Sequence, residues 1–116
     1  MKRMLIVDDE AVILDAARLL LSASGVDVTT HADPIAGQEA ALAEDFDLIV
    51  LDLWLGAKNG AELTEQIKRS KPEAKILITT GDPSDPLVQR ALAAGAIGLL
   101  KKPFQMKELL GRLESG

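Results

Sequence analysis

Five short apolar segments alternate along the chain with segments of helical spacing, and this alternation constrains the fold more than any other feature. The apolar segments are rich in Val, Ile and Leu, and they are Met4–Val7, Val26–His31, Leu48–Leu51, Ile76–Thr79 and Ile97–Leu100. The helical segments are residues 11–24, 34–43, 61–70, 86–94 and 105–114. Strands that alternate with helices indicate a parallel sheet with helices on both of its faces.

Local signals support the helices. Asp33 precedes Pro34 and Asp85 precedes Pro86, and a capping residue followed by a first-turn proline is typical of a helix start. Apolar spacing predicts one buried face for each helix. In the first helix this predicted face consists of Ile13, Ala17, Leu20 and Leu21, and in the last of Met106, Leu109, Leu110 and Leu113.

The strands differ in pattern. Leu48–Leu51 and Ile76–Ile78 are apolar without alternation, so we expect them to be central and buried on both sides. Residues 26–29 alternate between apolar and polar, which favours an edge strand.

Composition limits the classes of function that the chain can have. The 116 residues fit one domain, residues 1–116, and the net charge of -5 argues against direct nucleic-acid binding, which needs a basic face. The chain has no cysteine, which excludes disulfides and cysteine-ligated metals. The apolar run Met4–Val7 is too short for a signal peptide or a membrane span. We therefore expect a cytoplasmic protein without membrane association.

Polar side chains follow four of the expected strands. They are Asp8, Asp9 and Glu10 after the first, Asp52 after the third, Thr79 and Thr80 at the end of the fourth, and Lys101 and Lys102 after the fifth. Sites in open parallel sheets form at the carboxyl ends of the strands. We expect these side chains to converge at that edge.

Carboxylates held close together repel one another, and a hard divalent cation relieves this repulsion. Oxygen ligands favour Mg²⁺, with Mn²⁺ or Ca²⁺ as substitutes, over zinc. Because Mg²⁺ keeps positions for phosphate oxygens, the pattern indicates a site that receives a phosphoryl group. Asp52 is central, and its carboxylate can attack phosphorus to form an acyl phosphate. Lys102 and Thr80 would contact the remaining phosphoryl oxygens.

Each of these polar residues could also serve the fold alone, without a role in a site. Asp8 and Asp9 suit the cap of the first helix, and Asp52 suits a turn after a buried strand. A lysine pair is commonly solvated. The joint placement at four strand ends favours the site over these separate interpretations.

With these motifs the sequence resembles the receiver domain of bacterial two-component response regulators. The resemblance covers almost the whole chain. It rests on Leu5–Glu10 (LIVDDE), Asp47–Leu53 (DLIVLDL), Ile76–Gly81 (ILITTG) and Gly95–Phe104 (GAIGLLKKPF). It implies a flavodoxin-like (βα)5 three-layer α/β sandwich whose five-stranded parallel sheet has the order 2-1-3-4-5.

The resemblance also implies the role of each residue. Asp52 accepts a phosphoryl group from a histidine kinase or a small acyl phosphate, Thr80 is the switch hydroxyl, and Lys102 contacts the phosphoryl group. The Lys102–Pro103 bond is expected to be cis, and Gly60 stands where the family's loop requires it. The expected Mg²⁺ ligands are Asp8, Asp9, Asp52 and the backbone carbonyl of Trp54.

A member of this family is a signalling switch rather than a turnover enzyme, with self-directed phosphoryl transfer and autodephosphorylation only. Its partners are a sensor histidine kinase or a phosphotransfer protein, and a downstream effector or a fused output domain. The face formed by residues 86–94, 97–100 and 105–114 is one through which such domains form homodimers. The kinase, the pathway and the type of output are not encoded in these residues.

Three departures from the family pattern stand out. Leu99 replaces the Tyr or Phe that usually lies three residues before the lysine, which argues against aromatic coupling to Thr80. Leu55-Gly56 replaces a frequent Met-Pro, so the loop after Asp52 is looser. Trp54 lies two residues beyond Asp52, and we expect its ring to slow the loss of phosphate.

Three other functions agree less well with these residues. Aspartate-dependent phosphohydrolases usually carry a second Asp where this chain has Trp54. A flavodoxin-like cofactor site needs a Gly- or Ser/Thr-rich phosphate loop, and Asp8-Asp9-Glu10 would repel a phosphate there. A pseudo-receiver that only binds partners would not need the complete set of acids, threonine and lysine.

Overall fold

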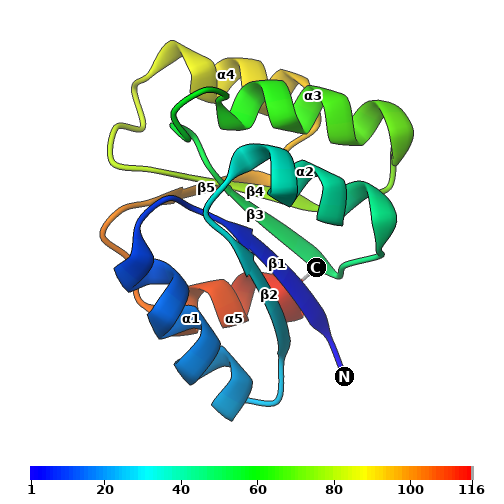
Figure 1. Cartoon of the computed structure of the whole chain (residues 1–116). Helices are drawn as coiled ribbons and strands as arrows, with labels where there is room; N and C mark the ends of the chain where they lie inside the picture. Colours follow the sequence, from blue (N-terminus) through cyan, green and yellow to red (C-terminus); the bar gives the residue numbers. More distant parts are fainter. Residues whose placement is uncertain (116) are drawn as a thin grey trace.

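The computed structural model describes residues 1–115, in which five strands alternate with five helices (Figure 1). The strands are β1 (Arg3–Val7), β2 (Asp27–His31), β3 (Leu48–Asp52), β4 (Ile76–Thr80) and β5 (Gly98–Lys101). The helices are α1 (Ala11–Ala23), α2 (Pro34–Ala43), α3 (Gly60–Ser70), α4 (Pro86–Ala93) and α5 (Met106–Ser115). The predicted segments are confirmed to within a residue at either end, while residue 116 of the predicted domain lies outside the described part.

All neighbouring strands are parallel, in the order β2-β1-β3-β4-β5. Helices α1 and α5 cover one face of this sheet, and α2, α3 and α4 cover the other (Figure 1). The flavodoxin-like three-layer fold and its strand order are therefore confirmed.

The hydrophobic core has two parts, one on each face of the sheet. Met4 and Ile6 of β1 pack in the part beneath α1 and α5, whereas Leu5 and Val7 pack in the part beneath the other helices. Every residue of β3 and of β4 is buried, as expected of central strands. Strand β2 lies at the edge and is only partly buried, as its alternating pattern predicts.

The buried face of α1 differs from the prediction. Leu14, Ala17 and Leu21 are buried, whereas Leu20 is 50% exposed. Positions 14, 17 and 21 follow i, i+3 and i+7, so they form a straight stripe, and Leu20 lies one residue around the helix from it. Leucines on both sides of the stripe made the face ambiguous in the sequence. Of the helices in residues 1–115, none combines the length and the apolar character needed to cross a bilayer.

Side-chain caps fix where three helices begin. Asp33 accepts a hydrogen bond from the backbone N–H of Ala36 (2.9 Å), and Asp85 accepts one from Leu87 (2.9 Å). Both caps are the ones that the sequence predicts. Asn59 and Glu62 form a reciprocal capping box at the start of α3.

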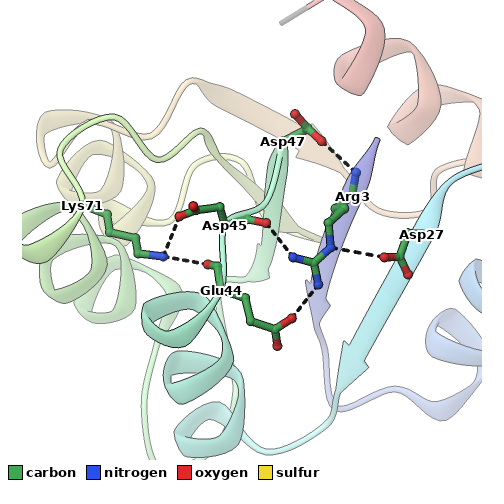
Figure 2. A network of polar contacts seen from close by, with 6 residues as sticks. All are labelled: Arg3, Asp27, Glu44, Asp45, Asp47 and Lys71. Atoms are coloured by element: carbon green, nitrogen blue, oxygen red, sulfur yellow. Dashed lines mark hydrogen bonds and ion pairs between the residues drawn. The ribbon is translucent and has the colours of Figure 1, made fainter. Parts of the chain in front are cut away.

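At the amino ends of the strands, Arg3 organises a network of polar contacts (Figure 2). Its backbone N–H donates to Asp47 (2.8 Å). Its guanidinium donates to three groups from neighbouring segments, namely the carboxylates of Asp27 (3.2 Å) and Glu44 (2.5 Å) and the backbone carbonyl of Asp45 (3.0 Å). These contacts join β1, β2 and the α2–β3 connection at the amino ends of the strands.

Candidate functional site

The carboxyl ends of β1, β3 and β5 bring together four of the side chains that the sequence predicts at this edge, namely Asp8, Glu10, Asp52 and Lys102. Lys102 lies just after β5, and its Nζ is 3.0 Å from a carboxylate oxygen of Asp8 and 3.2 Å from one of Asp52. Lys102 also pairs with Glu10. Three carboxylates from two strand ends thus surround one ammonium group.

Asp8 occupies the junction between β1 and α1. Its backbone N–H donates to His31 (3.1 Å), which extends the pairing of β1 with β2 by one residue. Its carboxylate accepts a hydrogen bond from the N–H of Glu10 (2.9 Å), and the residue is only 2% exposed. The N-cap residue of α1 is Glu10, without a side-chain cap, so the interpretation of Asp8 and Asp9 as helix caps is wrong.

Asp52 is the last residue of β3 and is 7% exposed. Burial and the negative charge of Asp8 raise its pKa to about 6, although Lys102 and the backbone N–H of Trp54, which donates to this carboxylate, act in the opposite direction. Burial likewise raises the pKa of Asp8, against the hydrogen bonds from Glu10 and Lys102. The site therefore holds two carboxylates that resist ionisation unless a positive charge compensates them.

A backbone hydrogen bond joins Lys102 to the end of β4. Its N–H donates to the carbonyl of Thr80 (2.8 Å), and the Lys102–Pro103 bond is cis, as the resemblance implies. Burial acts to lower the pKa of the ammonium group. Hydrogen bonds to Glu10 and Asp8, together with the charges of Asp52 and Asp8, outweigh burial and raise it, so Lys102 stays protonated.

Thr80 ends β4 and is buried. Its hydroxyl accepts a hydrogen bond from the N–H of Asp82 (3.1 Å) in the β4–α4 loop. Thr80 therefore lies at the predicted strand end, but its hydroxyl is hydrogen-bonded to Asp82, in the loop that leads into α4.

Gly60 brings the start of α3 against the end of β3. Its N–H donates to the carbonyl of Leu53 (2.8 Å). A Cβ at this position would lie 2.8 Å from the carbonyl oxygen of Asp52, which is too close unless the backbone shifts. The absence of a side chain here lets the loop after Asp52 close tightly.

The donor set fits a hard divalent cation. Oxygen atoms of Asp8, Glu10 and Asp52 lie within 4.8 Å of one another, and such all-oxygen sets suit Mg²⁺, Mn²⁺ or Ca²⁺. Asp9 is exposed and lies outside this group of three. Glu10 was expected at this edge beside Asp8 and Asp9, but it was not among the predicted metal ligands.

Trp54 extends from the site toward α4. Its indole Nε1–H donates to a carboxylate oxygen of Asp85 (2.8 Å), and the residue is 55% exposed. The sequence indicated Asp85 only as a helix cap. The contact of Asp85 with the indole of Trp54 depends on the paths of two loops, so no local sequence signal predicts it.

Known proteins are similar to this chain in sequence and in fold. The family model described as the response regulator receiver domain matches residues 4–114. The transcriptional regulatory protein FixJ of Bradyrhizobium diazoefficiens is 33% identical over 95% of this chain and 54% of its own length. The chain spans about half the length of the curated relatives it matches.

Two solved structures are also similar. A CheY-like response regulator receiver domain protein from Methanospirillum hungatei superposes with a TM-score of 0.93 at 32% identity, covering 99% of this chain and 92% of that one. The receiver domain of the sensor histidine kinase PA1611 from Pseudomonas aeruginosa, solved with a magnesium ion in its active-site cleft, has a TM-score of 0.87 at 27% identity. That match covers 98% of this chain and 95% of the other.

Proposed function

Because this chain belongs to the receiver domain family of two-component response regulators, we propose that Asp52 is the residue on which it accepts a phosphoryl group. Members of this family are signalling switches that are phosphorylated on an aspartate to regulate an output. The observation that carries the assignment is the contact of Lys102 with the buried carboxylates of both Asp52 and Asp8. This contact places a fixed positive charge beside the carboxylate at the centre of the sheet.

In the proposed reaction a carboxylate oxygen of Asp52 attacks the phosphorus of the donor. The bond between phosphorus and the donor's leaving atom breaks, and an acyl phosphate forms. The ammonium of Lys102 stabilises the added negative charge. The hydroxyl of Thr80 exchanges its hydrogen bond with Asp82 for one with a phosphoryl oxygen, so the β4–α4 loop follows the state of Asp52.

The site would hold Mg²⁺ or Mn²⁺ through Asp8, Asp9, Asp52 and the backbone carbonyl of Trp54, and Glu10 is a further candidate ligand. The close approach of the carboxylates of Asp8, Glu10 and Asp52 supports a cation here. A bound divalent cation would neutralise charge on the transferred phosphoryl oxygens.

Partners are proposed by the same reasoning. The phosphodonor is a sensor histidine kinase or a phosphotransfer protein, and Val12 and Leu19, exposed on α1, offer apolar surface to it. Leu92 and Ile97 are exposed on α4 and just before β5, on the face proposed for homodimers.

The output belongs to an effector or to a fused domain, and direct nucleic-acid binding is not expected of a domain with a net charge of -5. A cytoplasmic location stays a prediction.

The test is intact mass spectrometry after incubation with acetyl phosphate and Mg²⁺. We expect one phosphate adduct on the wild-type protein and none on Asp52→Asn, since the amide cannot attack phosphorus. Asp45→Asn is the matched control, because Asp45 is fully exposed at the other end of the sheet, and it should keep the adduct. An adduct of equal yield on Asp52→Asn would show that the phosphoacceptor lies elsewhere.

A further inference from the structure

Three side chains form a row across the carboxyl end of the sheet, and Thr79 is the third of them. Val7 of β1 pairs with Leu51 of β3, so Asp8 stands next to Asp52. Asp52 in turn pairs directly with Thr79 of β4. Residues that are paired in neighbouring parallel strands project from the same face of the sheet. The side chains of Asp8, Asp52 and Thr79 therefore project side by side.

The hydrophobic core identifies the face from which this row projects. Alternate residues of a strand share a face. Val50, two residues before Asp52, and Leu77, two residues before Thr79, both pack in the part of the core beneath α1 and α5. Neighbouring strands lie about 4.8 Å apart, so Thr79 is one strand spacing from the proposed phosphoacceptor. Thr80 projects from the opposite face by the same alternation.

The hydroxyl of Thr79 has no hydrogen-bond partner among residues 1–115, although the residue is only 1% exposed. Its neighbours on this face are few. Leu77 precedes it, Gly81 follows it without a side chain, and Leu100 is its pairing partner on β5. Of the four adjacent positions, Asp52 alone carries a polar side chain. An unused donor is thus buried next to a carboxylate.

The carboxylate of Asp52 needs another donor when Lys102 turns to a phosphoryl group. In the described structure it is contacted by Lys102 and by the backbone N–H of Trp54. An ammonium group has three N–H donors, and that of Lys102 already contacts three carboxylates. A contact with a phosphoryl oxygen must replace one of these. Rotation about a single side-chain bond would let the Thr79 hydroxyl take the place of Lys102 at Asp52.

We propose that Thr79 is a positioning residue whose hydroxyl donates a hydrogen bond to a carboxylate oxygen of Asp52 during phosphoryl transfer. This inference rests on the proposed phosphorylation of Asp52. The hydroxyl keeps its proton, and the bond goes to the oxygen that does not attack phosphorus. It holds the plane of the carboxylate and so aims the attacking oxygen at the donor.

Three substitutions in β4 separate the hydroxyl from the shape of the side chain. Thr79→Val keeps the shape and removes the hydroxyl, whereas Thr79→Ser keeps the hydroxyl and removes a methyl group. Ile78→Val is the matched control, because Ile78 is a buried, β-branched residue of the same strand that packs on the opposite face. Each protein is mixed with acetyl phosphate and Mg²⁺, and the rate of adduct formation is followed by intact mass spectrometry.

We expect Thr79→Val to form the adduct about tenfold more slowly, the factor that one hydrogen bond to a charged group supplies. Thr79→Ser and Ile78→Val should react at close to the wild-type rate. The loss in Thr79→Val should lie in the maximal rate and not in the acetyl phosphate concentration that gives half of it. Thr79 contacts Asp52 and not the donor, and the bond is made only during transfer.

The controls make the outcomes distinct. A wild-type rate in Thr79→Val would overturn this inference and leave phosphorylation of Asp52 intact. It would equally be overturned if Thr79→Ser or Ile78→Val were as slow as Thr79→Val, since packing in β4 would then explain the loss. A wild-type protein that forms no adduct, or one that keeps it in Asp52→Asn, would instead overturn the proposed function, and this inference with it.

Discussion

At the scale of single residues, Thr79 carries a buried hydroxyl without a hydrogen-bond partner among residues 1–115. A buried hydroxyl that loses its bonds to water and gains none destabilises the fold. Valine has nearly the same shape and no such group. We expect Thr79→Val to raise the free energy of unfolding by about 1 kcal/mol, measured by urea denaturation.

Thr64 provides the matched control for this substitution. It is equally buried, but its hydroxyl donates to the carbonyl of Gly60 (2.7 Å). Thr64→Val should therefore lower the free energy of unfolding by about 1 kcal/mol. If Thr79→Val were as damaging as Thr64→Val, the hydroxyl of Thr79 would have to be bonded, for example to a buried water.

Single residues also show what the sequence could and could not predict about the site. Asp8, Asp52 and Lys102 were predictable because each stands at or just after the end of a strand, and parallel strands end at one edge of the sheet. The pairing of Lys102 with Glu10 was not predictable, because it depends on how the loop after β1 turns into α1. The contact of Trp54 with Asp85 escaped prediction for the same reason, because it joins two loops.

At the scale of elements, the junction of β3 and α3 depends on close approach at Gly60. Alanine there would place its Cβ 2.8 Å from the carbonyl oxygen of Asp52 and 3.2 Å from the Cα of Leu53. Both are backbone atoms, so the end of β3 would have to shift. We expect Gly60→Ala to cost about 1–3 kcal/mol of stability and to slow phosphorylation of Asp52, measured by denaturation and by the rate of adduct formation.

Gly111→Ala is the control for Gly60→Ala. Gly111 lies within α5, and nothing lies within 4 Å of its added Cβ. Alanine is the better helix former, so this variant should be more stable by about 0.5–1 kcal/mol. A neutral Gly60→Ala would mean that the loop after Asp52 relaxes more easily than its contacts indicate.

Elements were predictable to the extent that their signals are local. The caps of α2 and α4 were correct because Asp-Pro pairs act within one turn. The buried face of α1 was not predicted correctly, because that helix carries leucines around much of its circumference. Only packing against the sheet selects Leu14 over Leu20. Where the local pattern allowed two buried faces, tertiary packing determined which one is buried.

At the scale of the whole molecule, the charged groups at the two ends of the sheet differ in burial. At the amino ends, Arg3 and Lys71 contact Asp27, Glu44 and Asp45, whose side chains are exposed to solvent (Figure 2). At the carboxyl ends, Lys102 pairs with Asp8, Glu10 and Asp52, and the carboxylates of Asp8 and Asp52 are buried. Because two buried carboxylates share one ammonium group there, stability at that end should depend on pH and on cations.

The expected dependence follows from Asp52, whose pKa rises from 3.8 to about 6 on folding. Between these pH values the folded protein binds more protons than the unfolded chain, so the free energy of unfolding falls as pH rises through this window. Without metal we expect a loss on the order of 2 kcal/mol, measured by urea denaturation at several pH values. Mg²⁺ should restore stability above pH 6 but not near pH 4, where protons compete for its ligands. Asp52→Asn should flatten the metal-free profile, and an Asp52→Asn slope equal to that of wild type would place the titrating group elsewhere.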